Sequence, residues 1–298
     1  MASTKRVPCS DQALTRGDPM YGTAGAGQAW ALLELSGGWG PSAFLNSPSV
    51  IAPELGRAVA RRFESAGMRI AAIRRPGHRP TPPRWRWYLG FAAEGSEALY
   101  QGEVTDPGDY LDLALDGSDG QRCADPVVIV CAHGRHDQCC AVRGRGAVAA
   151  IAARYPEITW ECSHLGGDRF AATMLVLPEG LCYGRIDGTD AAGLIDKYFA
   201  GTLDNRFLRG RTSLPHPVQA AQYFAREALG EDRIRALSPL SVDHLHDTIR
   251  VVLAGVAGPI EVLLDEQMSE PLLSMCRSTV AGPVRTFALR SIIPTSVD

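Results

Sequence analysis

Short apolar runs separated by glycine- and proline-rich turns predict alternating strands and a helix in the first part of the chain. Runs of four to eight apolar residues between turn signals are typical of strands, whereas apolar residues three or four positions apart mark one helix face. In residues 30–104 this pattern predicts the order strand, helix, strand, strand, strand. The ranges are 30–35, 53–67, 68–73, 85–91 and 98–104.

The same order returns after a polar stretch, over residues 126–131, 147–155, 158–162, 173–177 and 181–186. We interpret this recurrence as a duplicated βαββ unit, although residue identity between the two halves is slight. Helices at 191–200 and 217–229 and strands at 248–253, 260–264 and 284–289 complete an α/β (α+β) prediction. The predicted divisions are an N-terminal arm (1–29), two βαββ segments (30–120 and 121–213) and a C-terminal segment of helix and strands (214–298).

Composition narrows the class of protein. The 298 residues are 45% hydrophobic and 21% charged, as in ordinary soluble domains, and the net charge is -3. This charge gives no bulk reason to expect nucleic acid or an anionic membrane as a partner. Five arginines and two tryptophans within residues 74–87 are therefore better interpreted as a solvated loop. No secretory signal or membrane-spanning apolar run is recognisable, so we expect a cytoplasmic protein.

The cysteines change this picture. The chain has 8 cysteines, and five of them fall within residues 123–162. In a reducing compartment, clustered cysteines are more often metal ligands or catalytic thiols than disulfides. Cys9, Cys182 and Cys276 stand apart and are expected to have no chemical role.

Two loops carry the candidate chemistry. Cys131 lies where a buried strand ends, and Cys139 and Cys140 lie across a polar loop, just before the predicted helix. The positive end of a helix favours thiolate over thiol, and soft metals bind thiolate.

The next strand carries Cys162 and His164, which alternate residues would place on one face. Gly166 and Gly167 permit a reversal that could return Asp168 to the position of His164. The spacing alone fits either a tetrahedral zinc site or a binuclear iron–sulfur cluster.

Residues 127–185 resemble the sucrase/ferredoxin-like family, a branch of the thioredoxin-like [2Fe–2S] ferredoxins. The resemblance lies in four motifs, given below with the residues that match the family pattern. They are Cys131-x-His133-Gly134-x-x-Asp137-x-Cys139-Cys140-Ala141, Trp160-Glu161-x-Ser163-His164-x-Gly166-Gly167, Arg169-Phe170-Ala171 and Leu177-Pro178-x-Gly180-x-x-Tyr183-Gly184-Arg185.

The resemblance implies two thioredoxin-like units, the second of which carries a [2Fe–2S] cluster. The family uses a Cys-x8-Cys pair with a His-x3-His pair, which carry over to Cys131, Cys140, His164 and position 168. Position 168 is Asp168 here and not the family's histidine, which leaves the fourth ligand open: we expect Asp168, with Cys162 as its alternate. Cys139 is an alternate to Cys140. His133 and His136 lie between the cysteines and are expected to be loop residues or donors to the ligands.

The family implies electron transfer rather than sugar hydrolysis. We therefore expect a ferredoxin-like single-electron carrier, more than a stand-alone enzyme, with an unidentified reductase or acceptor as its redox partner. The first unit has no cysteine over residues 30–104 and is expected to lack a cofactor. Two alternatives remain open: a zinc-stabilised interaction protein that uses the same residues, and a thiol redox enzyme or sensor that uses Cys139 or Cys140.

Overall fold

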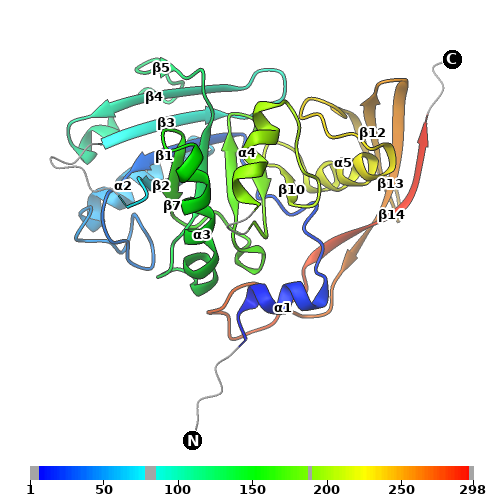
Figure 1. Cartoon of the computed structure of the whole chain (residues 1–298), viewed down its shortest axis with the longest axis horizontal. Coiled ribbons are helices and arrows are strands. Elements are labelled where there is room, and N and C mark those ends of the chain that lie inside the picture. Colours follow the sequence, from blue (N-terminus) through cyan, green and yellow to red (C-terminus); the bar gives the residue numbers. More distant parts are fainter. Residues whose placement is uncertain (1–6, 78–84, 187–189, 295–298) are drawn as a thin grey trace, which may run out of the picture.

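A ten-stranded mixed sheet organises the chain in a computed structural model that describes residues 7–77, 85–186 and 190–294. A separate four-stranded antiparallel sheet is built from the C-terminal part of the chain (Figure 1). The mixed α/β class expected from the sequence is confirmed. The sheet order is β10-β9-β8-β6-β7-β2-β1-β3-β4-β5.

The first half of the large sheet comes from one βαββ unit. Strand β1 pairs in parallel with β2 and antiparallel with β3, and β3 continues into a hairpin with β4. Helix α2 crosses between β1 and β2; it begins at Pro53, whose fixed φ suits a first helical turn, and buries Val59 and Phe63. The elements are β1 (Ala29–Glu34), α2 (Pro53–Ser65), β2 (Met68–Arg74), β3 (Trp85–Phe91) and β4 (Ala98–Val104).

The second half repeats this connectivity. Strand β6 pairs in parallel with β7 and antiparallel with β8, and β8 forms a hairpin with β9. An antiparallel pair between β2 and β7 joins the two halves into one sheet. The elements are β6 (Val127–Cys131), α3 (Gln138–Arg154), β7 (Thr159–Cys162), β8 (Met174–Leu177) and β9 (Leu181–Tyr183).

Strand alternation divides the core into layers. On β6, Ile129 and Cys131 face one side, where a single apolar cluster runs through both halves. Val128 and Val130 face the other side, beneath α3 and α4 (Ala191–Phe199). The corresponding side of the first half forms a separate cluster beneath α2. Alternate strand residues point to opposite faces, so Cys131 belongs to the face away from the helices.

The remaining elements lie at the edges and at the C-terminal end. Short strands β5 (Gln121–Arg122) and β10 (Leu208–Arg211) end the large sheet. Helix α5 packs against the small sheet, with Val218 beside Val251 and Val262 in one cluster. The helix is α5 (His216–Leu229), and the strands of the small sheet are β11 (Pro239–His244), β12 (Ile249–Gly255), β13 (Gly258–Met268) and β14 (Arg285–Pro294).

Two elements differ from the sequence prediction in ways that matter for the site. Helix α3 starts at Gln138, not at residue 147, so Cys139 and Cys140 lie in its first turn rather than before it. The N-terminal arm contains a helix, α1 (Cys9–Arg16). Figure 1 shows α1 beside the segment that links β13 to β14, residues 269–284, although these parts are far apart in sequence.

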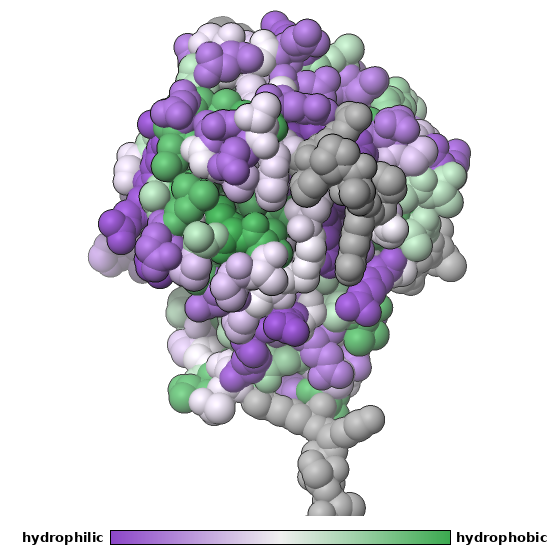
Figure 2. Space-filling view, turned by 90° about the vertical axis from the view of Figure 1, so that its left-hand side faces the viewer, coloured by the Kyte–Doolittle hydropathy of each residue, from purple (hydrophilic) through white to green (hydrophobic). Residues whose placement is uncertain are grey.

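The molecular surface carries both polar and apolar areas. Viewed from the side of α2, it is mostly hydrophilic around a compact apolar area (Figure 2). Within the described ranges, no helix combines the length and apolar character needed to cross a membrane.

The described arginines of residues 74–87 make contacts within the chain. Arg74 pairs with Glu161 at 2.7 Å, and Arg86 pairs with Glu103 at 2.8 Å. The Arg75 guanidinium lies 3.8 Å from the centre of the Trp160 ring. Arg79 and Arg84 lie outside the described residues. Arg74 lies on β2 and Arg86 on β3, so the expectation of a solvated loop is wrong for these two residues. The absence of a nucleic-acid partner stays a prediction.

Candidate metal centre

The first turn of α3 positions two adjacent cysteines. Asp137 is the N-cap residue, and its carboxylate accepts a hydrogen bond from the Cys139 backbone N–H at 2.8 Å. Consecutive helical residues point about 100° apart, because a turn contains 3.6 residues. Cys139 and Cys140 therefore face different neighbours, although both side chains are buried.

A glycine turn positions the second loop. Gly166 and Gly167 adopt positive φ of 89° and 82°, which lets the chain reverse directly after His164. The buried Arg209 side chain supports the turn by donating to the carbonyl oxygen of Gly166 at 3.0 Å. Asp168 then starts a short 3-10 helix, η2 (Asp168–Phe170). The sequence analysis expected the reversal but not this helix.

The two loops bring all four residues of the predicted ligand set together. The Cys140 sulfur lies 3.5 Å from Oδ1 of Asp168, and Nδ1 of His164 lies 3.1 Å from the same oxygen. The Cys131 thiol hydrogen-bonds with both Cys140 and His164. We call these four residues the 131/140/164/168 site. That they hold a metal stays a prediction.

Proton sharing within this metal-free site favours the thiolate form of Cys131, whereas the raised pKa values of Cys140 and His164 keep both of these groups protonated. The hydrogen bond from Cys140 is the main reason why the pKa of the Cys131 thiol falls to about 6. Burial lowers the pKa of His164, but hydrogen bonds to Asp168 and Cys131 outweigh burial and raise it to about 9. Because metals bind thiolate and neutral imidazole, a bound cation would have to displace the protons of Cys140 and His164.

The alternate ligands have different surroundings. Cys162 is fully buried on β7 beside Cys131 in the strand register, and its thiol has no hydrogen-bond partner within the described part of the chain. Cys139 points away from the 131/140/164/168 site toward Cys9 and Cys276. Neither geometry favours these residues over Asp168 or Cys140.

The two loop histidines also differ. His133 is buried, and its Nε2 lies 2.6 Å from the carbonyl oxygen of Gly40; burial lowers its pKa to about 4. His136 stacks on His164 with the ring centres 3.8 Å apart. Its Nε2 is buried without a hydrogen-bond partner, and His136, His164 and Asp168 could together hold a metal ion. The sequence analysis expected His136 to be a loop residue or a donor to the ligands, so a direct ligand position goes beyond that expectation.

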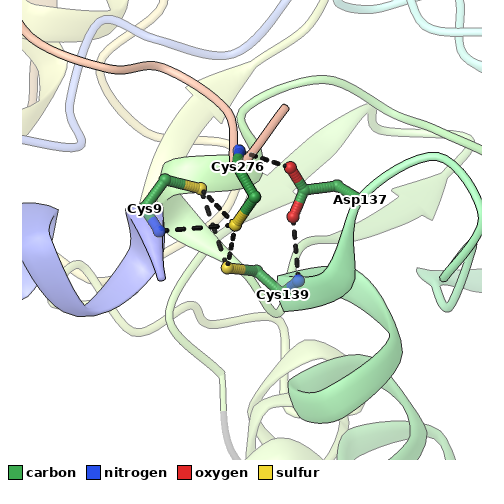
Figure 3. A group of neighbouring side chains, drawn as sticks. All are labelled: Cys9, Asp137, Cys139 and Cys276. Atoms are coloured by element: carbon green, nitrogen blue, oxygen red, sulfur yellow. Dashed lines mark hydrogen bonds between the residues drawn. The ribbon is translucent and has the colours of Figure 1, made fainter. Parts of the chain in front are cut away.

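A second group of donors lies beside the first. The sulfurs of Cys9, Cys139 and Cys276 are 3.1 to 3.6 Å from one another, and Asp137 adjoins them (Figure 3). This group could bind a metal. The expectation that Cys9 and Cys276 stand apart was wrong, since α1 and the 269–284 segment fold back onto the start of α3.

Comparison with known proteins gives one family and one distant structure. A model of the sucrase/ferredoxin-like family matches residues 23–210. No curated protein matches the chain.

Among solved structures, the chain is similar to a cysteine-to-serine variant of the thioredoxin-like [2Fe–2S] ferredoxin from Aquifex aeolicus. The identity is 17% and the TM-score 0.25, over 28% of this chain and 97% of that one. A likeness of this size defines neither the fold nor the chemistry of the present chain.

Proposed function

Because the chain belongs to the sucrase/ferredoxin-like family, we propose that it is a single-electron carrier with a [2Fe–2S] cluster in its second βαββ unit. On this proposal residues 121–213 form a thioredoxin-like ferredoxin domain, and residues 30–120 form a copy without a cofactor. The shared connectivity of the two halves supports this division, as does the lack of cysteine in residues 30–104. The observation that carries the proposal is the convergence of the 131/140/164/168 site.

The donor set suits a binuclear iron–sulfur centre. Cys131 and Cys140 would hold one iron as thiolates, while His164 and Asp168 would hold the other. When bound, the cluster supplies reversible one-electron chemistry. The protein supplies two thiolates, one imidazole and one carboxylate from two loops that the sheet and α3 hold in place. Arg209 contributes by fixing the turn between His164 and Asp168.

Asp168 is our choice for the fourth ligand because it contacts the other donors directly. Its side chain is 2% exposed and lies next to both Cys140 and His164. His136 is the competing ligand, since its unpartnered Nε2 lies within reach of the same position. The two possibilities differ in charge: a carboxylate adds one negative charge, whereas a neutral imidazole adds none.

This difference predicts the reduction potential. Replacing thiolates by neutral imidazoles raises the potential, as Rieske centres demonstrate. One imidazole and one carboxylate should leave this carrier between all-cysteine and Rieske centres. Reduction should also take up a proton if the other nitrogen of His164 reaches solvent, because the bound imidazole can titrate.

The test is spectroscopic. Protein purified without air should contain about two irons and two sulfides per chain, absorb visible light, and lose that absorption with dithionite. Electron paramagnetic resonance of the reduced protein should report one unpaired electron. Cys131→Ser should lose most of the iron, whereas Cys123→Ser, a half-buried cysteine away from the site, should retain it.

The fourth ligand follows from two further variants. Asp168→Ala should change the spectrum and lower the iron content, while His136→Ala should leave both unchanged. The reverse pattern would move the fourth ligand to His136, and an effect of Cys162→Ala alone would move it to Cys162. A colourless protein with one zinc that depends on Cys131 would refute electron transfer, as would a metal-free protein with a rapidly alkylated Cys139.

A further inference from the structure

Three of the six cysteines that the proposed cluster does not use converge on a second point. Sulfur–sulfur distances are 3.6 Å for Cys9 and Cys139, 3.1 Å for Cys139 and Cys276, and 3.4 Å for Cys276 and Cys9. Figure 3 shows the three sulfurs pointing at one another from α1, the start of α3 and the 269–284 segment. Family similarity ends at residue 210 and begins at residue 23, so Cys9 and Cys276 lie outside it.

We propose that Cys9, Cys139, Cys276 and Asp137 form a separate site for one zinc ion. The distances exclude an existing disulfide, whose sulfurs are about 2.05 Å apart. Three sulfurs at about 2.3 Å from a tetrahedral zinc lie about 3.8 Å from one another, slightly farther than observed here. A small outward movement would therefore admit the ion. Cysteines that ligate different irons of a cluster lie farther apart, so this triangle fits a single ion.

Asp137 supplies the fourth donor and positions two of the others. One carboxylate oxygen accepts the backbone N–H of Cys139 at 2.8 Å, and the other accepts that of Cys276 at 2.7 Å. Each oxygen keeps a lone pair, because a carboxylate has about four acceptor positions. Three thiolates with one oxygen donor suit zinc, which accepts both sulfur and oxygen.

Two helix ends favour the thiolates that such a site needs. Cys9 is the first residue of α1 and Cys139 lies in the first turn of α3, so the positive ends of both helices meet at the sulfurs. The Cys9 backbone N–H also donates to the Cys276 sulfur at 3.4 Å. Arg143 holds the two helices together through Ser10 and Asp11, adding a positive charge nearby.

The ion would fasten both outer parts of the chain to the cluster domain. Cys9 is 130 residues from Cys139 in sequence, and Cys276 is 137 residues from it. Arg143 and Arg185 already tie α1 to this domain through side-chain hydrogen bonds, and the ion would add a link that includes the 269–284 segment. A bound ion would add the binding free energy of the metal to the stability of the folded chain.

Metal analysis of the full chain tests the site independently of the cluster. Protein purified from medium containing iron and zinc should hold one zinc per chain, and zinc X-ray absorption should report three sulfurs and one oxygen. In competition with a chelator, Cys9→Ser and Cys276→Ser should bind zinc at least about tenfold more weakly, while their iron content stays at the wild-type level when iron is supplied in excess. Cys182→Ser, a buried cysteine outside the group, is the matched control, and Cys131→Ser should lose iron but keep zinc.

Alkylation of the wild-type chain gives a measurement that needs no variant to fold. Zinc should slow the alkylation of Cys9, Cys139 and Cys276 together, as read by peptide mass spectrometry, and leave Cys123 unaffected. Equal rates with and without zinc would overturn the proposal. So would a disulfide between two of the three cysteines in protein kept from air, iron instead of zinc at this site, or zinc that disappears with Cys131→Ser.

Discussion

Helix α3 passes so close to the end of β6 that only glycine fits at position 144. A Cβ added to Gly144 would overlap the carbonyl oxygen of Cys131 and come within 3.0 Å of its carbonyl carbon. The obstacle is backbone, so no side-chain rotation can relieve it. Gly144→Ala must push α3 away from the strand, which separates Cys131 from Cys140.

A second glycine of the same helix provides the control. A Cβ at the exposed Gly146 would meet nothing within 4 Å. Alanine favours a helix interior over glycine by about 0.5–1 kcal/mol, so Gly146→Ala should stabilise the chain by about that amount. Gly144→Ala has the same gain but also an overpacking cost of about 3 kcal/mol, which leaves a net loss of about 2 kcal/mol.

Urea unfolding followed by far-ultraviolet circular dichroism measures both values. The two variants should differ by about 3 kcal/mol at an unchanged denaturant slope. Iron content should fall in Gly144→Ala and stay at the wild-type level in Gly146→Ala. If Gly144→Ala were as stable as Gly146→Ala, the close approach of α3 to β6 would be wrong, together with the cysteine geometry that depends on it.

Three further predictions concern the residues around the site. Burial lowers the pKa of His133 to about 4, below its usual 6.5, so stability should be complete above pH 6.5 and decline as the pH falls toward 4. The full loss is about 3 kcal/mol, and urea midpoints of His133→Gln should lack this part of the pH dependence. In metal-free protein, Asp168→Asn should return the pKa of His164 from about 9 toward its ordinary value, because the substitution removes the carboxylate beside the imidazole. NMR titration of His164 measures this pKa, and an unchanged value would contradict the contact. Gly167 has a positive φ, and a Cβ at this position would lie 2.5 Å from the Arg209 guanidinium. Gly167→Ala should therefore lower the free energy of unfolding by about 1–3 kcal/mol and lower the iron content. Unaltered thermal unfolding would contradict the described turn.

Local patterns predict those parts of the fold that local forces specify. The hairpin strands β3 and β4 have the predicted bounds, because apolar alternation and turn residues mark both ends. Helix α3 begins nine residues before its predicted start, since its first two turns carry polar residues, cysteines and glycine instead of an apolar stripe. The N-cap Asp137 was the available signal for that start.

The donor residues also divide into those that local patterns predict and those that they do not. Cys131, Cys140, His164 and Asp168 lie in two short motifs that flank neighbouring strands of one parallel pair, so sequence order carries their proximity. Cys9 and Cys276 reach Cys139 only after the sheet, α1 and the 269–284 segment have assembled. No periodicity along the chain encodes such a contact, and each of the two cysteines alone looks like an ordinary thiol.

The adjacent cysteines at the start of α3 make the two groups depend on each other. Cys140 faces Asp168 and the proposed cluster, while Cys139 faces Cys9 and Cys276, and Asp137 caps the turn that holds both. A change that loosens the outer group therefore acts on the backbone that carries Cys140. Residues outside 23–210 would in this way stabilise a ligand inside that range, although they contribute no donor to the cluster themselves. Loosening the outer group should therefore weaken the affinity of the chain for the cluster without changing which residues ligate it, because the two groups share no donor.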